Sequence, residues 1–289
     1  MSKPTGPVDG GVDWAVARAA LQSETARLTT MLRTVRRPTA PALGAWNLSE
    51  VAVHVATAWA VIPALAAGDL DAVRAALPGL LPPGAIAMIQ TPQELAHFTV
   101  AAVKACWDPD LAAVADRIDR AAAAYLNACA DRHPEQAHQW MIHGVRFTQP
   151  TFTCHLLNET ITHSYDIARA ERRPWRVDPD HARHVVEGFV LPVLARRAAD
   201  DSPGVGHLQL RIRGGRNYLV EFTAAGGARI AAGHSTGKAD AYLSADPAAL
   251  LLARWRRVPT WRSLPTGGLL AWGRKPWLAT RLATLAPAI

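Results

Sequence analysis

The pattern of apolar residues changes abruptly near residue 204, and this change requires a fold with two unlike parts. Before it, Ala, Leu and Val recur at helical spacing, as in the segment 12–36. After the turn-rich segment DSPGVG at 201–206, HLQLRIRG and NYLVEFT alternate apolar and polar residues on either side of a GGR turn. The sequence therefore predicts a helical domain over residues 1–203 and a small α+β domain over residues 204–289.

The helical part contains clear start and stop signals. A helix is expected to begin after Asn47, because Asn47 can cap it and Glu50 follows three residues later, as in a capping box. Pro63 is expected to end or kink that helix. Another helical region runs from 93 to about 132, and WDPD at 107–110 is expected to break it into two helices.

Several shorter elements complete this outline. The segment AHQWMIHGVRFTQPTF favours a short extended or hairpin-like link, and a helix is expected over 178–201. In the last part of the chain, ARIAAG and ADAYLSA indicate two further strands. DPAALLLARWRR and PWLATRLATLA indicate two helices there.

Charge and cysteine content restrict the partners and the compartment. Residues 207–289 hold 12 Lys and Arg against 3 Asp and Glu, a net of +9, whereas the whole chain has a net charge of +7. No helix-turn-helix, zinc-finger or RNA-binding signature accompanies this basic region, so acidic small molecules are favoured over nucleic acid. The three cysteines form no C-x-x-C pair, which suits a reducing cytoplasm.

A membrane partner is not expected. The longest uncharged run, 51–68, approaches the length of a membrane span, but it is rich in Ala and contains His54 and Pro63. A buried helix of a soluble bundle is the better interpretation. The first eleven residues show no apolar signal segment, so a cytoplasmic protein is expected.

Polar residues recur at helical spacing between 151 and 171. Glu159 and His163 are four residues apart, so a helix places them one above the other on one face. With a histidine from another helix they would form a nitrogen and oxygen site for a divalent metal such as zinc. His54, in the middle of an apolar helix, can supply that third ligand. The alternatives are an ordinary i,i+4 contact and a core histidine satisfied by hydrogen bonds.

Two motifs resemble a known family. WNLSEVAVH, ending at His54, and NETITHSYDIARA, which contains Glu159 and His163, are similar to segments of the mycothiol-dependent maleylpyruvate isomerase family. The resemblance implies a DinB-like four-helix bundle with His54, Glu159 and His163 as ligands of a divalent ion, zinc above all. It also implies a C-terminal sterol-carrier-like domain whose arginine points at the active site. Arg256 is the closest match, and Arg254 and Arg257 stay open.

The neighbouring residues have roles that the sequence leaves open. Asp166 can orient the imidazole of His163, or it can be a solvated surface charge. His155 can be a fourth ligand, a base or a filler. Cys154 is expected to be a small buried residue. Arg256 can grip a substrate carboxylate in bidentate fashion, or it can belong to a solvated basic cluster.

The function expected from these features is that of a metal-dependent enzyme. Mycothiol would act as the nucleophile on an electrophilic, anionic small molecule, by cis–trans isomerisation or by S-transfer. The alternatives are a metal-dependent hydrolase of thiol conjugates and a small-molecule binding protein with a structural metal. A site with three protein ligands plus solvent favours catalysis, and a fourth protein ligand such as His155 favours a structural metal. The physiological substrate and the oligomeric state are not predicted.

Overall fold

The computed structural model describes residues 11–81, 89, 91–142, 144–197, 202–235, 237–263 and 265–285. The chain forms two compact units, a helical unit over Asp13–Arg176 and a sheet unit that includes Val177–Ala288. The predicted combination of helices with a small sheet is confirmed. The finer predictions of a DinB-like bundle and of a sterol-carrier-like domain stay predictions.

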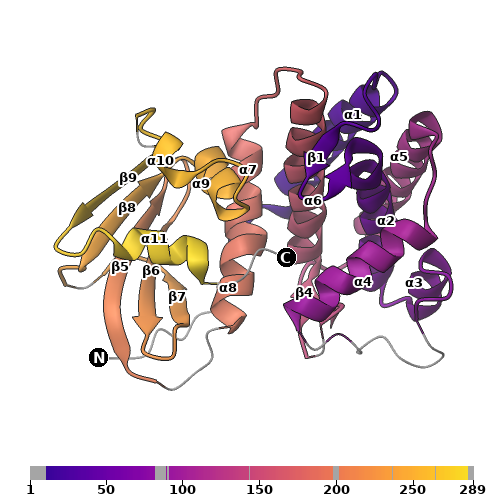
Figure 1. Ribbon diagram of the computed structural model, residues 1–289. Helices are drawn as coiled ribbons and strands as arrows, with labels where there is room; N and C mark the ends of the chain where they lie inside the picture. The colour runs from indigo at the N-terminus through magenta and orange to yellow at the C-terminus, as the bar shows by residue number, and fades with distance from the viewer. Residues whose placement is uncertain are drawn as a thin grey trace. The chain divides into compact units, whose positions relative to one another are not determined.

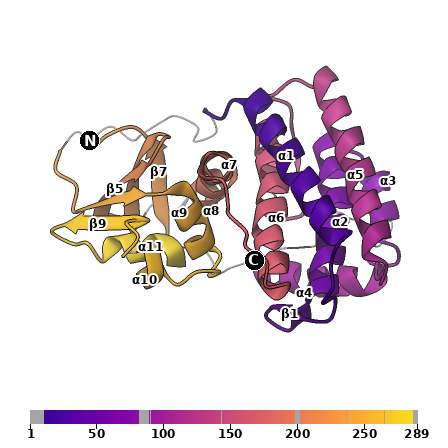
Figure 2. The same cartoon turned by 90° about the horizontal axis from the view of Figure 1, so that it is seen from above.

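Four long helices form the core of the helical unit (Figures 1 and 2). They are α1 (Trp14–Leu32), α2 (Leu48–Ala67), α5 (Leu111–Ala128) and α6 (Gln149–Ala170). Both α6 and α5 pack against α1 and α2, so the four helices enclose a common interior. The centre of α6 is therefore surrounded by other helices.

Helix α2 begins as predicted, and of the two outcomes expected at Pro63 an end of the helix is wrong, whereas a kink stays a prediction. The Asn47 side chain accepts a hydrogen bond from the backbone N–H of Glu50 at 3.0 Å, and the Glu50 carboxylate accepts one from the backbone N–H of Asn47 at 2.7 Å. Pro63 does not end the helix, which continues to Ala67 and is closed by Gly68 at φ 71°. Burial on both sides of Pro63, at Ile62 and Leu65, outweighs the lost backbone hydrogen bond.

Short elements surround this core. They are α3 (Leu70–Ala76), α4 (Pro92–Ala105), the 3-10 helix η1 (Cys129–Asp131), and the antiparallel pairs β1 (Pro41–Leu43) with β2 (Trp46–Asn47) and β3 (Ala137–Gln139) with β4 (Arg146–Thr148). The break between α4 and α5 and the hairpin-like link were both predicted and are confirmed. Helix α3 and the β1–β2 pair were not predicted, because each is too short to give a periodic signal.

The sheet unit is built on five strands, β5 (Gly204–Ile212), β6 (Asn217–Thr223), β7 (Ala228–Ala232), β8 (Ala241–Ala245) and β9 (Leu269–Gly273). Their order is β7-β6-β5-β8-β9, and only the β5–β8 pair among them is parallel. The predicted turn between β5 and β6 is confirmed. Helices α9 (Pro247–Arg254), α10 (Thr260–Ser263) and α11 (Leu278–Thr284) complete the C-terminal part.

The helix predicted over 178–201 consists of three pieces, α7 (Pro179–Val185), the π-helical segment η2 (Val186–Val190) and α8 (Leu191–Arg197). Residues 198–201 lie outside the described residues. All three pieces belong to the sheet unit, which therefore begins well before the predicted boundary after residue 203. Both α7 and η2 pack against α9, and α8 packs against β7. Residues of η2 and α8 help to line an apolar cavity of about 310 Å³.

Among the described residues, helix α2 is long and apolar enough to cross a membrane. However, 67% of its most apolar window is buried inside the structure. A mostly buried helix of this kind is typical of a protein core, so its composition is weak support for a membrane span.

Candidate metal centre

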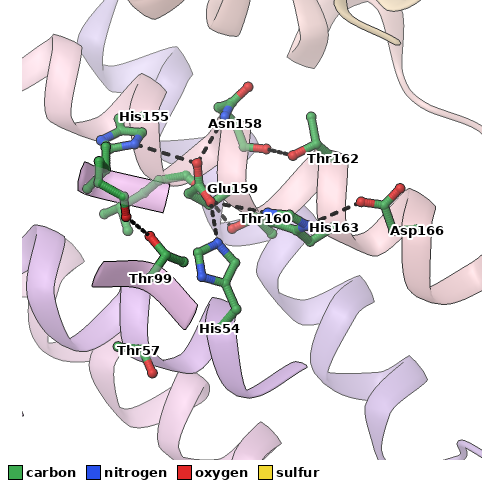
Figure 3. A network of polar contacts seen from close by, with 12 residues as sticks. His54, Thr57, Thr99, His155, Asn158, Glu159, Thr160, Thr162, His163 and Asp166 are labelled. Carbon is green, nitrogen blue, oxygen red and sulfur yellow. Dashed lines mark hydrogen bonds and ion pairs between the residues drawn. The ribbon is translucent and has the colours of Figure 1, made fainter. Parts of the chain in front are cut away.

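Helix α6 carries an unusual number of buried polar side chains. His155, Asn158, His163 and Asp166 are each at most 7% exposed. Burial of polar groups is costly unless they are satisfied by partners, so these side chains require contacts with one another or with a bound group. Figure 3 shows His155, Asn158 and His163 around Glu159 on α6, with Asp166 beyond His163 and His54 approaching from α2.

Three of the predicted site residues converge. Nε2 of His54 lies 3.1 Å from Oε2 of Glu159, and Nε2 of His163 lies 3.3 Å from the same oxygen. One potential ligand atom from each residue lies within 4.8 Å of the others. We call His54, Glu159 and His163 the ligand cluster. It is the one group of this kind found in the part of the chain that the structure describes.

Asp166 lies where the sequence predicted an orienting residue. Its Oδ2 is 3.2 Å from Nδ1 of His163, and the side chain is fully buried. An imidazole that donates its Nδ1 proton to a carboxylate keeps its lone pair on Nε2. In His163 that nitrogen is the one that faces Oε2 of Glu159. The alternative of a solvated surface charge at Asp166 is excluded by its burial.

The ionisation of the three residues is strongly affected by their surroundings. Burial lowers the pKa of His54, against the opposing hydrogen bond with Glu159. Burial alone would raise the pKa of Glu159, but hydrogen bonds with His155, His163 and His54 outweigh it and hold that pKa well below its usual value. Burial likewise opposes the charged form of His163, and the contacts with Asp166 and Glu159 outweigh it and raise the pKa of His163.

The residues of the ligand cluster suit a divalent metal ion. Two imidazole nitrogens and one carboxylate oxygen are a common ligand set for zinc in sites that keep one further position open. The carboxylate is ionised at neutral pH and one imidazole is already oriented, as metal ligands commonly are. The donor atoms therefore fit such an ion.

The other predicted residues lie in different surroundings. His155 is buried on α6, with Nε2 3.5 Å from Oε1 of Glu159, the oxygen that does not contact His54 and His163. Cys154 is fully buried, as expected. Arg256 belongs to the sheet unit, where it is exposed just after α9, and Arg254 is buried. A role for Arg256 in the same site stays a prediction.

Two residues that contact the ligand cluster, Asn158 and Trp46, begin the two sequence motifs, but sequence reasoning assigned neither of them a role in the site. Asn158 donates a hydrogen bond from Nδ2 to Oε1 of Glu159 at 3.1 Å. The ring of Trp46 lies 5.4 Å from that of His54, centroid to centroid. Asn158 immediately precedes Glu159, and adjacent residues on a helix point about 100° apart, so spacing gave no signal for it.

Comparisons with known proteins support the fold. The sequence matches no protein-family profile and no curated protein. A solved structure of a histidine-to-alanine mutant of the mycothiol-dependent maleylpyruvate isomerase aligns with 90% of this chain and 93% of its own, with a TM-score of 0.50 and 13% identity. A structure of the mycothiol-dependent maleylpyruvate isomerase aligns over the same shares, with a TM-score of 0.45 and 11% identity. At this identity the likeness concerns the fold.

Proposed function

We propose that the protein is a metal-dependent enzyme that uses a low-molecular-weight thiol, mycothiol, as nucleophile on an electrophilic and anionic small molecule. The observation that carries this proposal is the convergence of His54, Glu159 and His163 on one point, with Asp166 orienting His163. The two sequence motifs and the fold-level likeness to a mycothiol-dependent isomerase support the choice of thiol.

The chain's own residues perform distinct tasks in this proposal. His54, Glu159 and His163 hold the ion, which when bound would lower the pKa of a coordinated thiol so that thiolate is present at neutral pH. Cys129 and Cys154 are poorly suited to be that thiol, because they are at most 1% exposed. Cys106 is half-buried, and its Sγ donates a hydrogen bond to the backbone oxygen of Ala76 at 3.5 Å. The nucleophile is therefore an external thiol.

Two reactions are compatible with this site. In the first reaction the thiol adds to a C=C bond, the resulting single bond rotates, and the thiol leaves again. The substrate is then isomerised and the thiol is returned unchanged. Retention of the thiol, or displacement of a leaving group, would produce a stable thioether. The test is an assay of the metal-loaded protein with mycothiol and maleylpyruvate, alongside a panel of electrophiles, followed by mass spectrometry. Absence of thiol dependence with every substrate would refute the proposal.

One observation favours a second candidate, a small-molecule binding protein with a structural metal. The cavity of about 310 Å³ in the sheet unit is lined mainly by apolar side chains, as ligand pockets commonly are. Equilibrium binding of an environment-sensitive apolar dye, without any thiol-dependent turnover, would support this candidate over the enzyme.

A further inference from the structure

The two carboxylate oxygens of Glu159 have different surroundings (Figure 3). Oε2 lies 3.1 Å from Nε2 of His54 and 3.3 Å from Nε2 of His163. Oε1 lies 3.1 Å from Nδ2 of Asn158 and 3.5 Å from Nε2 of His155. One oxygen therefore faces the other members of the ligand cluster, and the second faces two residues outside it.

Contacts with neighbouring side chains are needed to hold the carboxylate of Glu159 in this one orientation. The last torsion of a glutamate side chain has broad minima, so the backbone alone does not decide which oxygen faces the cluster. An oxygen that already accepts hydrogen bonds is less available to a metal ion. Asn158 is 3% exposed and turns its amide NH₂ toward the carboxylate, because its amide oxygen would be repelled there.

His155 is held in place by aromatic neighbours. Its ring packs edge-on against Trp140, with centroids 5.5 Å apart, and near Phe147, at 6.3 Å. The ligand atoms that lie within 4.8 Å of one another come from His54, Glu159 and His163, and His155 is outside that group. Its Nε2 is placed to donate a hydrogen bond to Oε1 of Glu159.

We propose that Asn158 and His155 are positioning residues, which hold Oε1 of Glu159 so that only Oε2 is offered to the metal ion. His155 is then a hydrogen-bond donor and not a fourth ligand. With Glu159 restricted to one oxygen, the three protein ligands would leave a coordination position for an incoming thiol if the ion is bound. This inference rests on the metal site of the proposed function and is independent of which thiol or substrate is used.

The experiment uses Co²⁺ as the probe, added to metal-free full-length protein. Affinity is measured by competition with a chelator, and coordination is followed by the visible absorption of the bound ion. Asn158→Leu and His155→Phe remove the donors at similar volume, and His155→Gln keeps a donor. We expect Asn158→Leu and His155→Phe to lose about 10- to 100-fold in Co²⁺ affinity, with a weaker absorption as Glu159 binds through both oxygens. His155→Gln should restore affinity and spectrum.

Thr160→Val is the matched control, because Thr160 is equally buried on α6 and its hydroxyl bonds to the backbone oxygen of Leu156. Thr160→Val should keep the wild-type affinity and spectrum. Circular dichroism of each metal-free variant checks folding, and Asn158→Ala replaces Asn158→Leu if the larger side chain prevents it.

Three results would overturn the proposal. The first is wild-type affinity and spectrum in both Asn158→Leu and His155→Phe. The second is an equal loss in His155→Gln and His155→Phe, which would identify His155 as a ligand. The third is a wild-type protein that binds no Co²⁺, which would also remove the proposed function. Wild-type protein that binds Co²⁺ but shows no spectral change with thiol would instead contradict the proposed function alone.

Discussion

Nδ1 of His163 lies 3.2 Å from Oδ2 of Asp166, one helical turn further along α6. The carboxylate is fully buried, so it interacts with the imidazole with little screening by water. This pair fixes which nitrogen of His163 carries the proton and directs Nε2 to the side of Glu159. Asp166 would not contact the metal ion itself, but it orients His163, which would bind the ion.

Replacement of Asp166 by Asn is expected to weaken zinc binding. The amide NH₂ can donate to Nδ1 of His163, which would place the imidazole proton on Nε2, the atom needed by the ion. We expect about a 10- to 100-fold loss of zinc affinity in chelator competition. Ser164→Ala is the control, since Ser164 is fully buried on the same helix and its hydroxyl has no hydrogen-bond partner among the residues that the structure describes. Equal affinity in Asp166→Asn and wild type would exclude the orienting role.

Loss of any member of the ligand cluster is expected to abolish stoichiometric metal binding. Purified protein should contain about one divalent ion per chain, and His54→Ala, Glu159→Gln and His163→Ala should each contain far less, because two remaining ligands bind zinc poorly. Elemental analysis by mass spectrometry measures this directly. His97→Ala, at an exposed position on α4, should keep the wild-type content. Full occupancy in the cluster variants would show that the site lies elsewhere.

The sequence predicted the ligand cluster because two of its members follow the helical period. Glu159 and His163 are one turn apart on α6, and His54 stood out as a polar residue in an apolar helix. The meeting of His54 with the other two depends on packing of α2 against α6, which spacing alone does not reveal. The family resemblance supplied that step. The direction of each Glu159 oxygen depends on Asn158 and could not be predicted.

Parts of the fold escaped prediction for similar reasons. Capping signals at Asn47 and the alternation in β5 and β6 are local, and they predicted these elements correctly. The parallel pairing of β5 with β8 joins segments that are distant in the sequence, so no local pattern predicts it. Strand β9 has four exposed residues in five, so its sequence does not alternate between apolar and polar residues. Helix α2 continues through Pro63 because burial of the residues around it overrides the tendency of proline to end a helix.

The capping box of α2 is expected to contribute measurably to stability. Asn47→Ala removes the side-chain acceptor for the backbone N–H of Glu50, which costs about 1 kcal/mol in the free energy of unfolding. Asn47→Asp keeps an acceptor at the same position and should stay within about 0.5 kcal/mol of wild type. Urea denaturation followed by circular dichroism gives both values. A similar loss of stability in Asn47→Ala and Asn47→Asp would show that stability depends on the side-chain amide of Asn47 and not on its role as a helix cap.

The stability contribution of Asp240 is expected to depend on pH. The backbone N–H of His207 donates to Asp240 at 3.1 Å and Arg274 pairs with it at 2.8 Å, and these contacts lower the pKa of Asp240 in the folded state. A depressed folded pKa means that the stabilisation is present above the unfolded value, about 3.9, and is lost as the pH falls through the folded value.

Asp240→Asn should therefore be less stable than wild type at pH 7, and the difference should shrink toward pH 3. Urea denaturation at the two pH values measures it. Asp180→Asn is the control in the same unit, because the Asp180 side chain is 80% exposed and its ion pair with Arg183 is long, at 3.7 Å. A difference for Asp240→Asn that is constant between pH 7 and pH 3 would contradict the assignment.

Arg256 can be tested without disturbing the backbone. Its φ is 57°, in the left-handed region that favours glycine, so Arg256→Gly removes the guanidinium and relieves strain at once. If Arg256 grips a substrate carboxylate, Arg256→Gly should raise KM for an anionic substrate about 10-fold or more, with no loss of stability. Arg172→Gly is a matched control, since Arg172 is also exposed and has φ 58°. It should leave KM unchanged. Equal KM in Arg256→Gly and wild type would move the search to Arg254 and Arg257.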